Sequence, residues 1–523
     1  MLIGDLIRRR AAASPEQEFW RDKDLSISYD QVNRDANRVA RALLAEDLQP
    51  GDHIAICSAS CYEYTAVHFG VAKAGMVLAH LNPKFSPSEL QHVAEHSEAK
   101  LMFIGSSVAH RTEPLYDKLS KIIRWVGLPD GGTETCDWVE PIGHWVEDHG
   151  DDEPDLSPFA NPPDTPVIFP ESPLQLLYTS GTTGFPKGAL ISHQAKIRHG
   201  TTHVLNMRLG LGDRLYSALP LYHQFAQWLV LTSVPLAGAS VLAVPKFDPA
   251  HCWQSLLQGG ITHMGAVPTM LYRLLEHQET LVEPAPDLRG IVYGGAPMDA
   301  QRIQTLRVSF PGAELFQGFG QTEVGYCIGL HDPEHQTHPE SVGKADLFSE
   351  IMLVDEDGKL VPDGAVGEIV AATPYLMNGY YKDPIATSEF FAFGPEWGRT
   401  GDLALKDEDG FYHLAGRKVD LVISGGVNIY PIEIERALEK HPAVADVAVF
   451  GIPHPDWGET IHAVIVLNPN SQATEEQLAE FCRDELAGFK VPKSFSFTDA
   501  LPRTHSGKVR KIDLKAPYWE SFG

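Results

Sequence analysis

The sequence predicts an α/β protein with a large N-terminal domain of stacked α/β sheets with subdomains, followed by a small C-terminal α+β domain. Three observations support this prediction. The 523 residues exceed the length of one ordinary domain. Short apolar runs alternate with amphipathic stretches, which is typical of parallel sheets covered by helices. After Gly416 the pattern changes to that of a compact unit with the size of a small independent domain.

In the large domain the predicted strands are continuous apolar runs, and the predicted helices carry one apolar face. The strands are His53–Cys57, Leu101–Ile104 and Ser240–Val244, and the helices are Tyr29–Leu44, Ser86–Glu95 and Ala300–Ser309. The longest apolar stretch, Trp228–Val244, contains Pro235 and Gly238 and is short for a membrane span. We therefore expect a core helix, a turn and a strand there, and no integral membrane segment. Residues 129–173, rich in Asp, Glu, Pro and Gly, predict a surface excursion.

The small domain is expected over residues 421–523. Its predicted elements are a strand at Val422–Ile423, a helix at Ile432–Lys440, strands at Asp446–Phe450 and His462–Leu467, and a helix at Glu475–Leu486. The large domain then covers residues 1–417. The short segment 418–420 between the two domains is the predicted hinge.

Composition excludes some classes of function. The net charge of −27 argues against a general nucleic-acid-binding protein, because phosphate contacts need clustered Lys and Arg. The first residues show no apolar core ahead of a cleavage site, so no secretory signal is expected. The six cysteines form no CxxC pair and no zinc-type spacing. Buried free thiols and a cytoplasmic location are the expected outcome.

The strongest local motif is Tyr178–Gly188, with the sequence YTSGTTGFPKG, directly after the apolar run Leu174–Leu177. Alternating hydroxyl residues and glycines give a loop whose backbone N–H groups can surround phosphate oxygens, and Lys187 adds a positive charge. The motif differs from a Walker A loop because its lysine precedes Gly188 and not Ser or Thr. The alternative is an ordinary flexible surface loop.

Further motifs follow along the chain. They are Gly294–Pro297 (GGAP), Gln317–Glu323 (QGFGQTE), Gly367–Glu368, Arg399–Asp402 (RTGD), Gly416–Arg417, Ser424–Pro431 and Pro502–Lys511, which contains SGK. In this set and order the sequence resembles the adenylate-forming superfamily of acyl-CoA synthetases, adenylation domains and luciferases. The resemblance runs from about Asp5 to Lys515. It is closest to acyl- or aryl-CoA synthetases.

The resemblance implies a set of residues that bind ATP. They are Thr179, Ser180, Gly181, Thr182, Thr183, Gly184, Lys187, Gly294, Gly295, Ala296, Pro297, Gln317, Gly318, Phe319, Gly320, Asp402 and Arg417. It further implies that Thr322 donates to the α-phosphate, that Glu323 holds Mg²⁺, and that Asp402 accepts from the ribose hydroxyls. Lys508 would bridge the substrate carboxylate and the α-phosphate. Taken alone, Asp402 could close a turn, Thr322 could cap a helix, and Lys508 could lie in a solvated basic tail.

The acid substrate is expected beside His223, although a buried core histidine is the alternative. Gln224, Phe225, Ala226 and Gln227 follow it, and none of them is the anion that would bind an α-amino group, so an amino acid is not expected. The walls expected from the resemblance are Phe225–Val230, Met264–Pro268, Tyr293–Gly295 and Phe319–Cys327. Their apolar character favours an aliphatic or ring-bearing acid.

The reaction that the resemblance implies has two steps: the acid and ATP give acyl-AMP and pyrophosphate, and a thiol then releases AMP. The mobile small domain would present Lys508 first and then Gly425 and Gly426, which help to form a tunnel for coenzyme A. The alternatives are loading of a separate acyl carrier protein, and a relative that binds nucleotide without turnover. No feature of the sequence requires a luciferase-type oxidation. The oligomeric state is open between a monomer and a homodimer.

Two positions depart from the family pattern. Phe319 replaces the usual tyrosine, so stacking is retained while a hydroxyl is lost. Val419 stands where the family pivot is Asp or Lys, between Lys418 and Asp420. The pivot therefore either works without a charge or is displaced by one residue.

Overall fold

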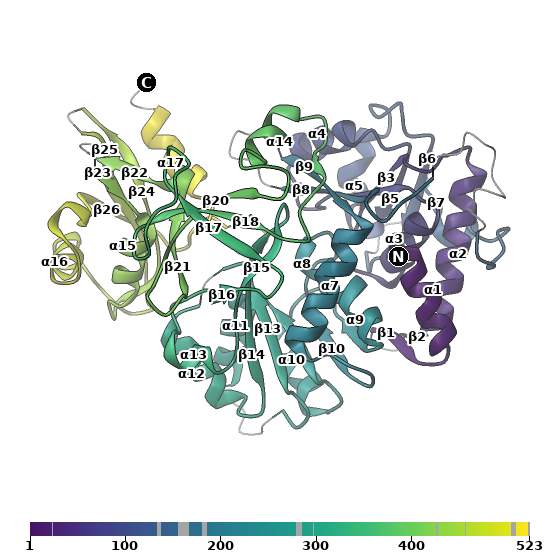
Figure 1. Ribbon diagram of the computed structural model, residues 1–523, viewed down its shortest axis with the longest axis horizontal. Coiled ribbons are helices and arrows are strands. Elements are labelled where there is room, and N and C mark those ends of the chain that lie inside the picture. The colour runs from purple at the N-terminus through teal and green to yellow at the C-terminus, as the bar shows by residue number, and fades with distance from the viewer. Residues whose placement is uncertain are drawn as a thin grey trace. The chain divides into compact units, whose positions relative to one another are not determined.

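The structure is a computed structural model (Figure 1), and it describes residues 1–22, 25–132, 138–154, 167–179, 186–278, 285–296, 298–424, 427–455, 457–503 and 509–520. The chain forms two compact units. The larger unit comprises residues 1–340, 345–350 and 371–398, and the smaller unit comprises residues 341–344, 351–370 and 399–523. The boundary predicted at residue 417 and the hinge at 418–420 stay predictions.

One sheet of the larger unit has the strand order β19-β9-β8-β4-β3-β5-β6-β7. Strands β3 to β6 and β8 run parallel, and β9 returns antiparallel to β8. The bounds are β3 His53–Cys57, β4 Val77–His80, β5 Leu101–Gly105, β6 Arg124–Leu128, β7 Glu140–Pro141, β8 Pro173–Thr179, β9 Lys187–Ser192 and β19 Gly379–Tyr380. The strands predicted at His53–Cys57 and Leu101–Ile104 are confirmed. The described part of the predicted excursion is more than a loop, because β7 pairs with β6 and is followed by α6 (Ile142–Trp145).

A second sheet has the order β15-β14-β13-β12-β10-β11-β1-β2. The bounds are β1 Glu18–Asp22, β2 Leu25–Ser28, β10 Arg214–Ser217, β11 Ser240–Ala243, β12 His263–Ala266, β13 Gly290–Gly294, β14 Glu314–Gln321 and β15 Gly325–Leu330. Strands β10 to β14 run parallel, and β15 folds back on β14. The N-terminal β1 pairs with β11, more than two hundred residues away, so the start of the chain completes this sheet.

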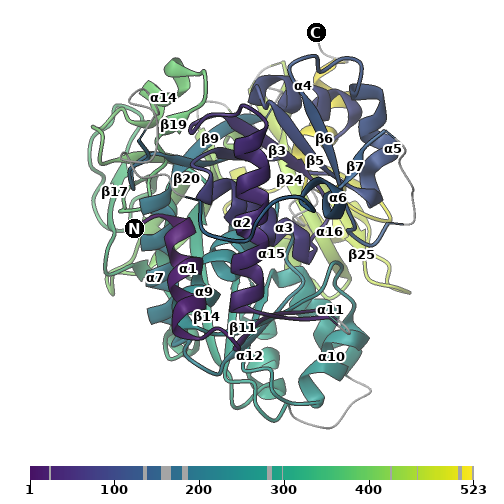
Figure 2. The same cartoon turned by 90° about the vertical axis from the view of Figure 1, so that its right-hand side faces the viewer.

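Helices cover both sheets, as Figures 1 and 2 show. Their bounds are α1 Ile3–Ala13, α2 Tyr29–Ala45, α3 Tyr62–Lys73, α4 Pro87–Ser97, α7 His193–Met207, α10 Pro249–Leu257, α11 Pro268–Gln278, α12 Ala300–Ser309 and α14 Pro384–Phe390. The helices predicted at Tyr29–Leu44, Ser86–Glu95 and Ala300–Ser309 are confirmed. Local signals fix their starts: Ser28 caps α2, and Ser86 with Glu89 forms a capping box on α4.

The apolar stretch Trp228–Val244 is folded inside the larger unit. It contributes to α8 (Gln224–Trp228), a π-helical turn at Leu229–Ser233, α9 (Val234–Ala237) and β11. Gly238 ends α9 with φ of 72°, a left-handed conformation that glycine adopts without strain. The predicted helix, turn and strand are therefore confirmed. None of the helices in the described ranges has the length and apolar content that crossing a membrane requires.

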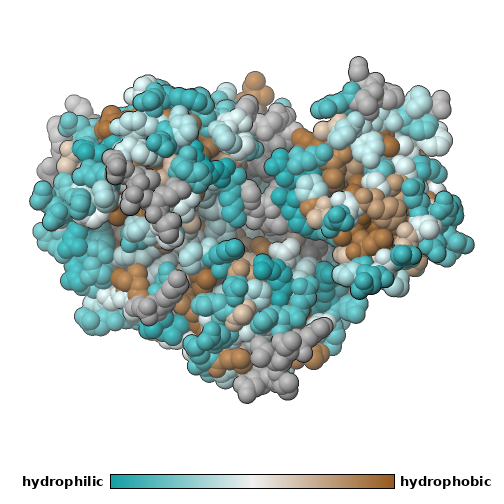
Figure 3. Space-filling view, turned by 180° about the vertical axis from the view of Figure 1, so that it is seen from behind, coloured by the Kyte–Doolittle hydropathy of each residue, from teal (hydrophilic) through white to brown (hydrophobic). Residues whose placement is uncertain are grey.

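The main core of the larger unit extends from α1, α2 and α3, which pack against one another and against α7 and α9, to the second sheet and its helices α10, α11 and α12. In Figure 2, α1 lies in front of α7 and α9. Trp20, Tyr29, Trp253 and Tyr293 are among its largest buried side chains. The face drawn in Figure 3 is mostly hydrophilic, with small groups of apolar residues and one larger group on the right of the view.

The smaller unit contains two sheets. The first has the order β17-β18-β20-β21, with β17 Glu350–Val354, β18 Gly367–Ala372, β20 Gly398–Lys406 and β21 Tyr412–Arg417. The second has the order β23-β22-β25-β24 with β26 on β25, and its strands are β22 Val422–Ser424, β23 Val427–Ile429, β24 Val444–His454, β25 Gly458–Leu467 and β26 Ser494–Phe497. Helices α15 (Pro431–Glu439), α16 (Glu475–Glu485) and α17 (Lys511–Glu520) accompany it. The predicted α+β character and element order of this region are confirmed.

Candidate active site

Two parallel strands bring the glycine motifs together at their carboxyl ends. Gly294, the last residue of β13, lies in register with Gly318 of β14. A methyl group built on Gly294 would lie 2.6 Å from the carbonyl oxygen of Gly318, so no larger residue fits this approach. Gly295 follows with φ of 88°, and Gly295 and Ala296 are both exposed. The carboxyl end of a parallel sheet is the usual place for a ligand in such folds.

The β14–β15 hairpin carries the second group of predicted residues. Phe319 and Gly320 lie at its bulge, and Thr322 and Glu323 lie in its turn. A methyl group on Gly320 would lie 2.0 Å from the carbonyl oxygen of Gly325, which explains the glycine there. Gln317, earlier on β14, is buried and accepts a hydrogen bond from the Tyr293 hydroxyl at 3.2 Å.

Glu323 connects the hairpin to the strand that leads into the predicted phosphate loop. Its carboxylate is buried, and Oε1 accepts hydrogen bonds from the Thr179 hydroxyl at 3.1 Å and the Tyr380 hydroxyl at 3.0 Å. Thr179 is the last residue of β8, and Tyr380 belongs to β19. Burial and the adjacent Glu323 carboxylate raise the pKa of Tyr380 far above its ordinary value, so its hydroxyl stays a donor. The geometry thus joins three chain segments around one carboxylate.

Lys187 lies next to Tyr380. Its Nζ is 5.4 Å from the centre of the Tyr380 ring and 3.6 Å from Asp383 Oδ2. Sequence reasoning identified Lys187, Thr179 and Glu323 but missed Tyr380 and Asp383. The only signal for these two was the sequence Gly379–Asp383, in which aromatic and charged residues follow a glycine.

Several predicted residues lie outside the described residues. They are Ser180, Gly181, Thr182, Thr183, Gly184, Pro297, Gly425, Gly426 and Lys508. His223 is described, and it is exposed at the start of α8, where its carbonyl oxygen accepts from the Gln227 N–H at 3.2 Å.

In the smaller unit, Asp402 of β20 lies in register with Arg417 of β21. The Arg417 Nε donates to Asp402 Oδ1 at 2.9 Å, and Asp402 is buried. Glu368 of the GE motif is buried nearby in the same unit. It accepts from Arg399 Nε at 3.0 Å and from the Gly401 N–H at 3.3 Å. Burial alone would raise the pKa of Glu368, but the contacts with Arg399, together with Lys418 and the Gly401 N–H, outweigh burial and lower it. The RTGD and GE motifs therefore form one charged cluster.

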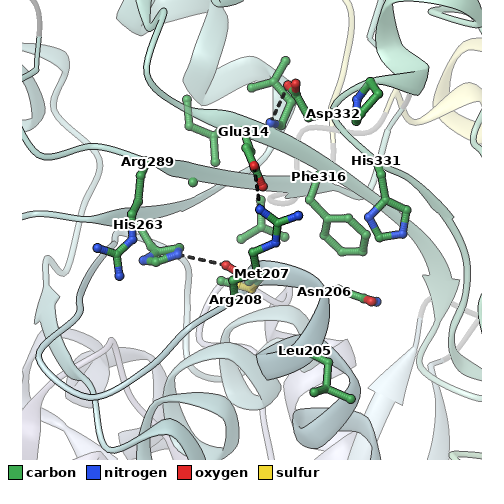
Figure 4. Close-up of a pocket in the computed structure, with 15 residues that line it drawn as sticks. Leu205, Asn206, Met207, Arg208, His263, Arg289, Glu314, Phe316, His331 and Asp332 are labelled. Carbon is green, nitrogen blue, oxygen red and sulfur yellow. Dashed lines mark hydrogen bonds and ion pairs between the residues drawn. The ribbon is translucent and has the colours of Figure 1, made fainter.

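A separate pocket of about 260 Å³ lies at the amino ends of β12, β13 and β14, away from the glycine motifs (Figure 4). Its charged groups are already paired. Arg208 donates to Glu314 Oε1 at 2.8 Å, and His263 Nε2 is 3.0 Å from the Met207 carbonyl oxygen. We therefore assign no ligand to this pocket.

Comparison with known proteins defines the class. Residues 7–381 match the family model described as AMP-binding enzyme, and residues 433–508 match that of its C-terminal domain. The chain is 33% identical over 514 residues to a feruloyl-CoA synthase of an Amycolatopsis species, covering 98% of each protein. It is 32% identical to the fatty acid–[acyl-carrier-protein] ligase ScoC of Streptomyces coeruleorubidus, covering 94% of the chain and 92% of ScoC. The crystal structure of ATP-bound MatB from Rhodopseudomonas palustris matches with a TM-score of 0.87 at 29% identity, over 100% of both chains.

Fold and motifs thus define an adenylate-forming enzyme. The chain belongs to the AMP-binding enzyme family. It is an AMP-forming acid–thiol ligase of the acyl-CoA synthetase type, which uses ATP to activate a carboxylic acid. The predicted family, fold class and class of reaction are confirmed.

Proposed function

We propose that acyl adenylate forms where the end of β8, the β14–β15 turn and β19 meet. The observation that carries this proposal is the pair of hydrogen bonds from Thr179 and Tyr380 to Glu323, which joins the phosphate-loop strand to the QTE motif. The glycines that follow β13 supply a flat surface for the adenine, and Phe319 supplies an aromatic face. The loop Ser180–Gly184 and Lys187 hold the β- and γ-phosphates.

The first step joins two anions, so charge compensation and positioning are the main catalytic effects. A carboxylate oxygen of the acid attacks the α-phosphorus of ATP, and pyrophosphate leaves. The Thr322 hydroxyl and the Lys508 ammonium stabilise the charge on the α-phosphate. In the second step the thiolate sulfur of coenzyme A attacks the acyl carbon, the bond to phosphate oxygen breaks, and AMP leaves.

We propose Glu323 as the residue that binds Mg²⁺. Among the described residues there is no group of three His, Cys, Asp or Glu side chains that could hold a metal by itself. Mg²⁺ does not need such a cage, because it commonly binds one or two carboxylates together with phosphate oxygens. A buried carboxylate with two neighbouring hydroxyls fits that ligand preference. The metal would supply charge stabilisation for the phosphates.

Asp402 and Arg417 are proposed to bind the ribose hydroxyls, and His223 to border the acid. Gly425 and Gly426 are proposed to line the path of coenzyme A after the small domain moves. The acid is proposed to have an apolar aliphatic or aromatic body.

Coenzyme A is the proposed acceptor, and a carrier protein is the alternative, because ScoC is named for such a partner. A cytoplasmic location is supported by five free, buried cysteines among the described residues.

The test is pyrophosphate release against a panel of aliphatic and aryl acids, with and without coenzyme A. We expect acid-dependent release of pyrophosphate, followed by acyl-CoA and AMP only when coenzyme A is present.

Lys508→Ala should abolish pyrophosphate release but retain most thioester formation from supplied acyl-AMP, because the ammonium acts only in the first step. Equal loss of both half-reactions would contradict the role of Lys508. Product formation only with an acyl carrier protein would favour the alternative acceptor.

A further inference from the structure

Lys196 is a buried lysine without a carboxylate partner. It lies on α7, its exposed fraction is 0%, and its Nζ donates to Gln224 Oε1 at 3.3 Å. None of the ion pairs between described residues includes it. Lys73, another buried lysine, by contrast pairs with Glu153 Oε2 at 2.6 Å. Burial lowers the pKa of Lys196 to about 7. An unpaired buried cation is costly, so a partner is expected.

Lys196 belongs to a polar face between two helices. On α7, Lys196, His199 and His203 are spaced by three and four residues, which places them on one side of the helix. On α8, Gln224 and Gln227 are spaced by three residues. The His203 ring stacks on Trp228 of α8 at 3.3 Å, so these two faces are in contact.

Many polar atoms in this region have no hydrogen-bond partner. The orphaned side-chain atoms in and around the two faces are His199 Nδ1, both nitrogens of His203, both polar atoms of Gln227, Gln175 Oε1, both nitrogens of His68, His80 Nε2 and Thr65 Oγ1. These residues are almost fully buried and come from α3, β4, β8, α7 and α8. We call them, with Lys196 and Gln224, the polar cluster. Buried polar groups in native proteins nearly always have a hydrogen-bond partner. A group of this many unpartnered atoms therefore indicates bound water or a ligand.

The polar cluster is connected directly to the candidate active site. Gln175 lies four residues before Thr179 on β8. Tyr326 lies three residues after Glu323, and its N–H donates to His199 Nε2 at 3.1 Å. Tyr375 stacks on His199 at 5.0 Å, and two residues later the Met377 N–H donates to the Glu323 carbonyl oxygen at 2.9 Å. The cluster therefore lies behind the residues that surround Glu323, along the wall predicted for the acid.

We propose that the polar cluster binds the far end of the acid substrate, and that this end carries a second anionic oxygen group, such as a carboxylate. This inference rests on the proposed function, because it places the activated carboxylate near Glu323. Lys196 would provide the counter-ion, and the Gln227 amide and the histidine N–H groups would provide further donors. A methyl-ended acid would leave the same groups buried and unpaired. The apolar walls expected from sequence would then contact only the body of the acid.

The test compares acids of equal length that differ at the far end: octanedioic, 8-hydroxyoctanoic and octanoic acid, and 4-carboxycinnamic and 4-methylcinnamic acid. Wild-type enzyme should use at least one carboxylate-ended acid with a kcat/KM roughly tenfold or more above its methyl-ended counterpart, because charged hydrogen bonds discriminate strongly. If the enzyme prefers the hydroxyl-ended acid to the carboxylate-ended acid, the polar cluster binds a neutral oxygen and not an anion, and the proposal is overturned. Equal use of all ends would also overturn it.

Variants show whether Lys196 and Gln227 cause the preference for a carboxylate-ended acid. Lys196→Met removes the charge and retains the length, and it should reduce the carboxylate-to-methyl ratio to about one. Removal of an unpaired buried charge should not impair folding. Lys73→Met, at the lysine that is already paired, should retain the wild-type ratio. Gln227→Met is a second variant with the same expected loss of preference as Lys196→Met. A preference that survives both Lys196→Met and Gln227→Met would refute the assignment.

Binding without turnover separates this inference from the proposed function. Calorimetric titration with octanedioic and octanoic acid should show tighter binding of the diacid by wild-type protein and no difference with Lys196→Met. If that difference appears but no acid releases pyrophosphate, the proposed function fails and the polar cluster stands. If acids are activated without any difference in binding, the polar cluster fails and the proposed function stands.

Discussion

Glu323 shows how a single side chain can link distant motifs. Its Oε1 is held by hydroxyls from Thr179 and Tyr380, which are 144 and 57 residues away in the sequence. Hydroxyl donors fix the orientation of a carboxylate without neutralising its charge. The carboxylate is thus oriented, and an oriented carboxylate oxygen is the kind of ligand that a hard cation prefers.

Glu323→Gln should therefore impair use of Mg²⁺·ATP and leave the fold nearly unchanged. The amide retains the volume and an acceptor oxygen for Thr179 and Tyr380 but loses the charge. We expect kcat/KM for ATP to fall by at least tenfold at limiting Mg²⁺, measured as pyrophosphate release over a Mg²⁺ titration. Glu389→Gln, at an exposed glutamate of α14, is the matched control. If the Glu323 variant has wild-type activity at limiting Mg²⁺, Glu323 does not bind the metal.

At the scale of elements, β13 and β14 approach so closely at Gly294 and Gly318 that a side chain is excluded. The strands run parallel and in register there, so a displacement would move Phe319 and the turn that carries Glu323. The geometry of the candidate nucleotide site thus depends on the glycine at position 294, whose Cβ would lie 2.6 Å from the Gly318 carbonyl oxygen.

Gly294→Ala should destabilise the protein by about 1–3 kcal/mol, the usual cost of overpacking, and should raise the KM for ATP. Chemical denaturation and steady-state kinetics measure the two effects. Gly143→Ala is the control, because a methyl group on Gly143 meets no atom within 4 Å. Unchanged stability and KM in the Gly294 variant would show that the strands can separate there without consequence.

The predicted hinge forms a short 3-10 helix, Lys418–Asp420. Val419 is 56% exposed, and both flanking charges are paired within the smaller unit. Lys418 Nζ is 3.5 Å from Glu368 Oε2, and Lys515 Nζ is 3.6 Å from Asp420 Oδ1. Glu368 precedes the segment in the chain and Lys515 follows it. The pivot at Val419 stays a prediction, because both ion pairs lie within one unit.

Val419→Pro should separate the two half-reactions. Proline fits the φ range of a 3-10 helix but holds φ near −65° and thus restricts rotation. We expect adenylation to survive better than thioester formation, with accumulation of acyl-AMP in single-turnover experiments. Lys418→Pro tests a pivot displaced by one residue. If neither variant accumulates acyl-AMP, alternation of the small domain about this segment is not supported.

At the scale of the whole molecule, several histidines are buried and neutral. Burial lowers the pKa of His193, His335 and His462 to about 4, and that of His68 to about 3. The unfolded chain binds protons at these sites below its ordinary histidine pKa of about 6.5, whereas the folded chain does not. Stability is therefore fully retained above pH 6.5 and is lost as the pH falls from there toward 4.

We expect the thermal unfolding midpoint to fall steadily between pH 6.5 and 4.5, with a shallower fall in His335→Gln. Glutamine keeps polar atoms for Tyr293 and the His331 carbonyl oxygen but does not titrate. Thermal denaturation at matched ionic strength measures both slopes. Parallel slopes for the two proteins would show that His335 does not contribute to the acid sensitivity.

The sequence by itself determined the family, the fold class, the order of elements and most motif residues. These features are local: a strand such as His53–Cys57 follows from a short apolar run, and a helix such as Ser86–Glu95 follows from its period and its capping serine. The phosphate loop and the QTE motif are each contiguous, so they are recognisable without a contact map. Tyr380 was missed because it lies outside the motifs.

The tertiary structure alone decided which side chains meet Glu323 and which polar groups lose water. In α7, Lys196, His199 and His203 are polar residues that a sequence pattern places on a solvated face. They are buried because α8 packs against that face and because β4, β8 and α3 lie nearby. Burial depends on neighbours that are distant in the chain, such as Gln175 and His68, and no local pattern encodes them. Packing therefore decides which far end of the acid the enzyme binds, because packing determines whether Lys196 contacts water or the substrate.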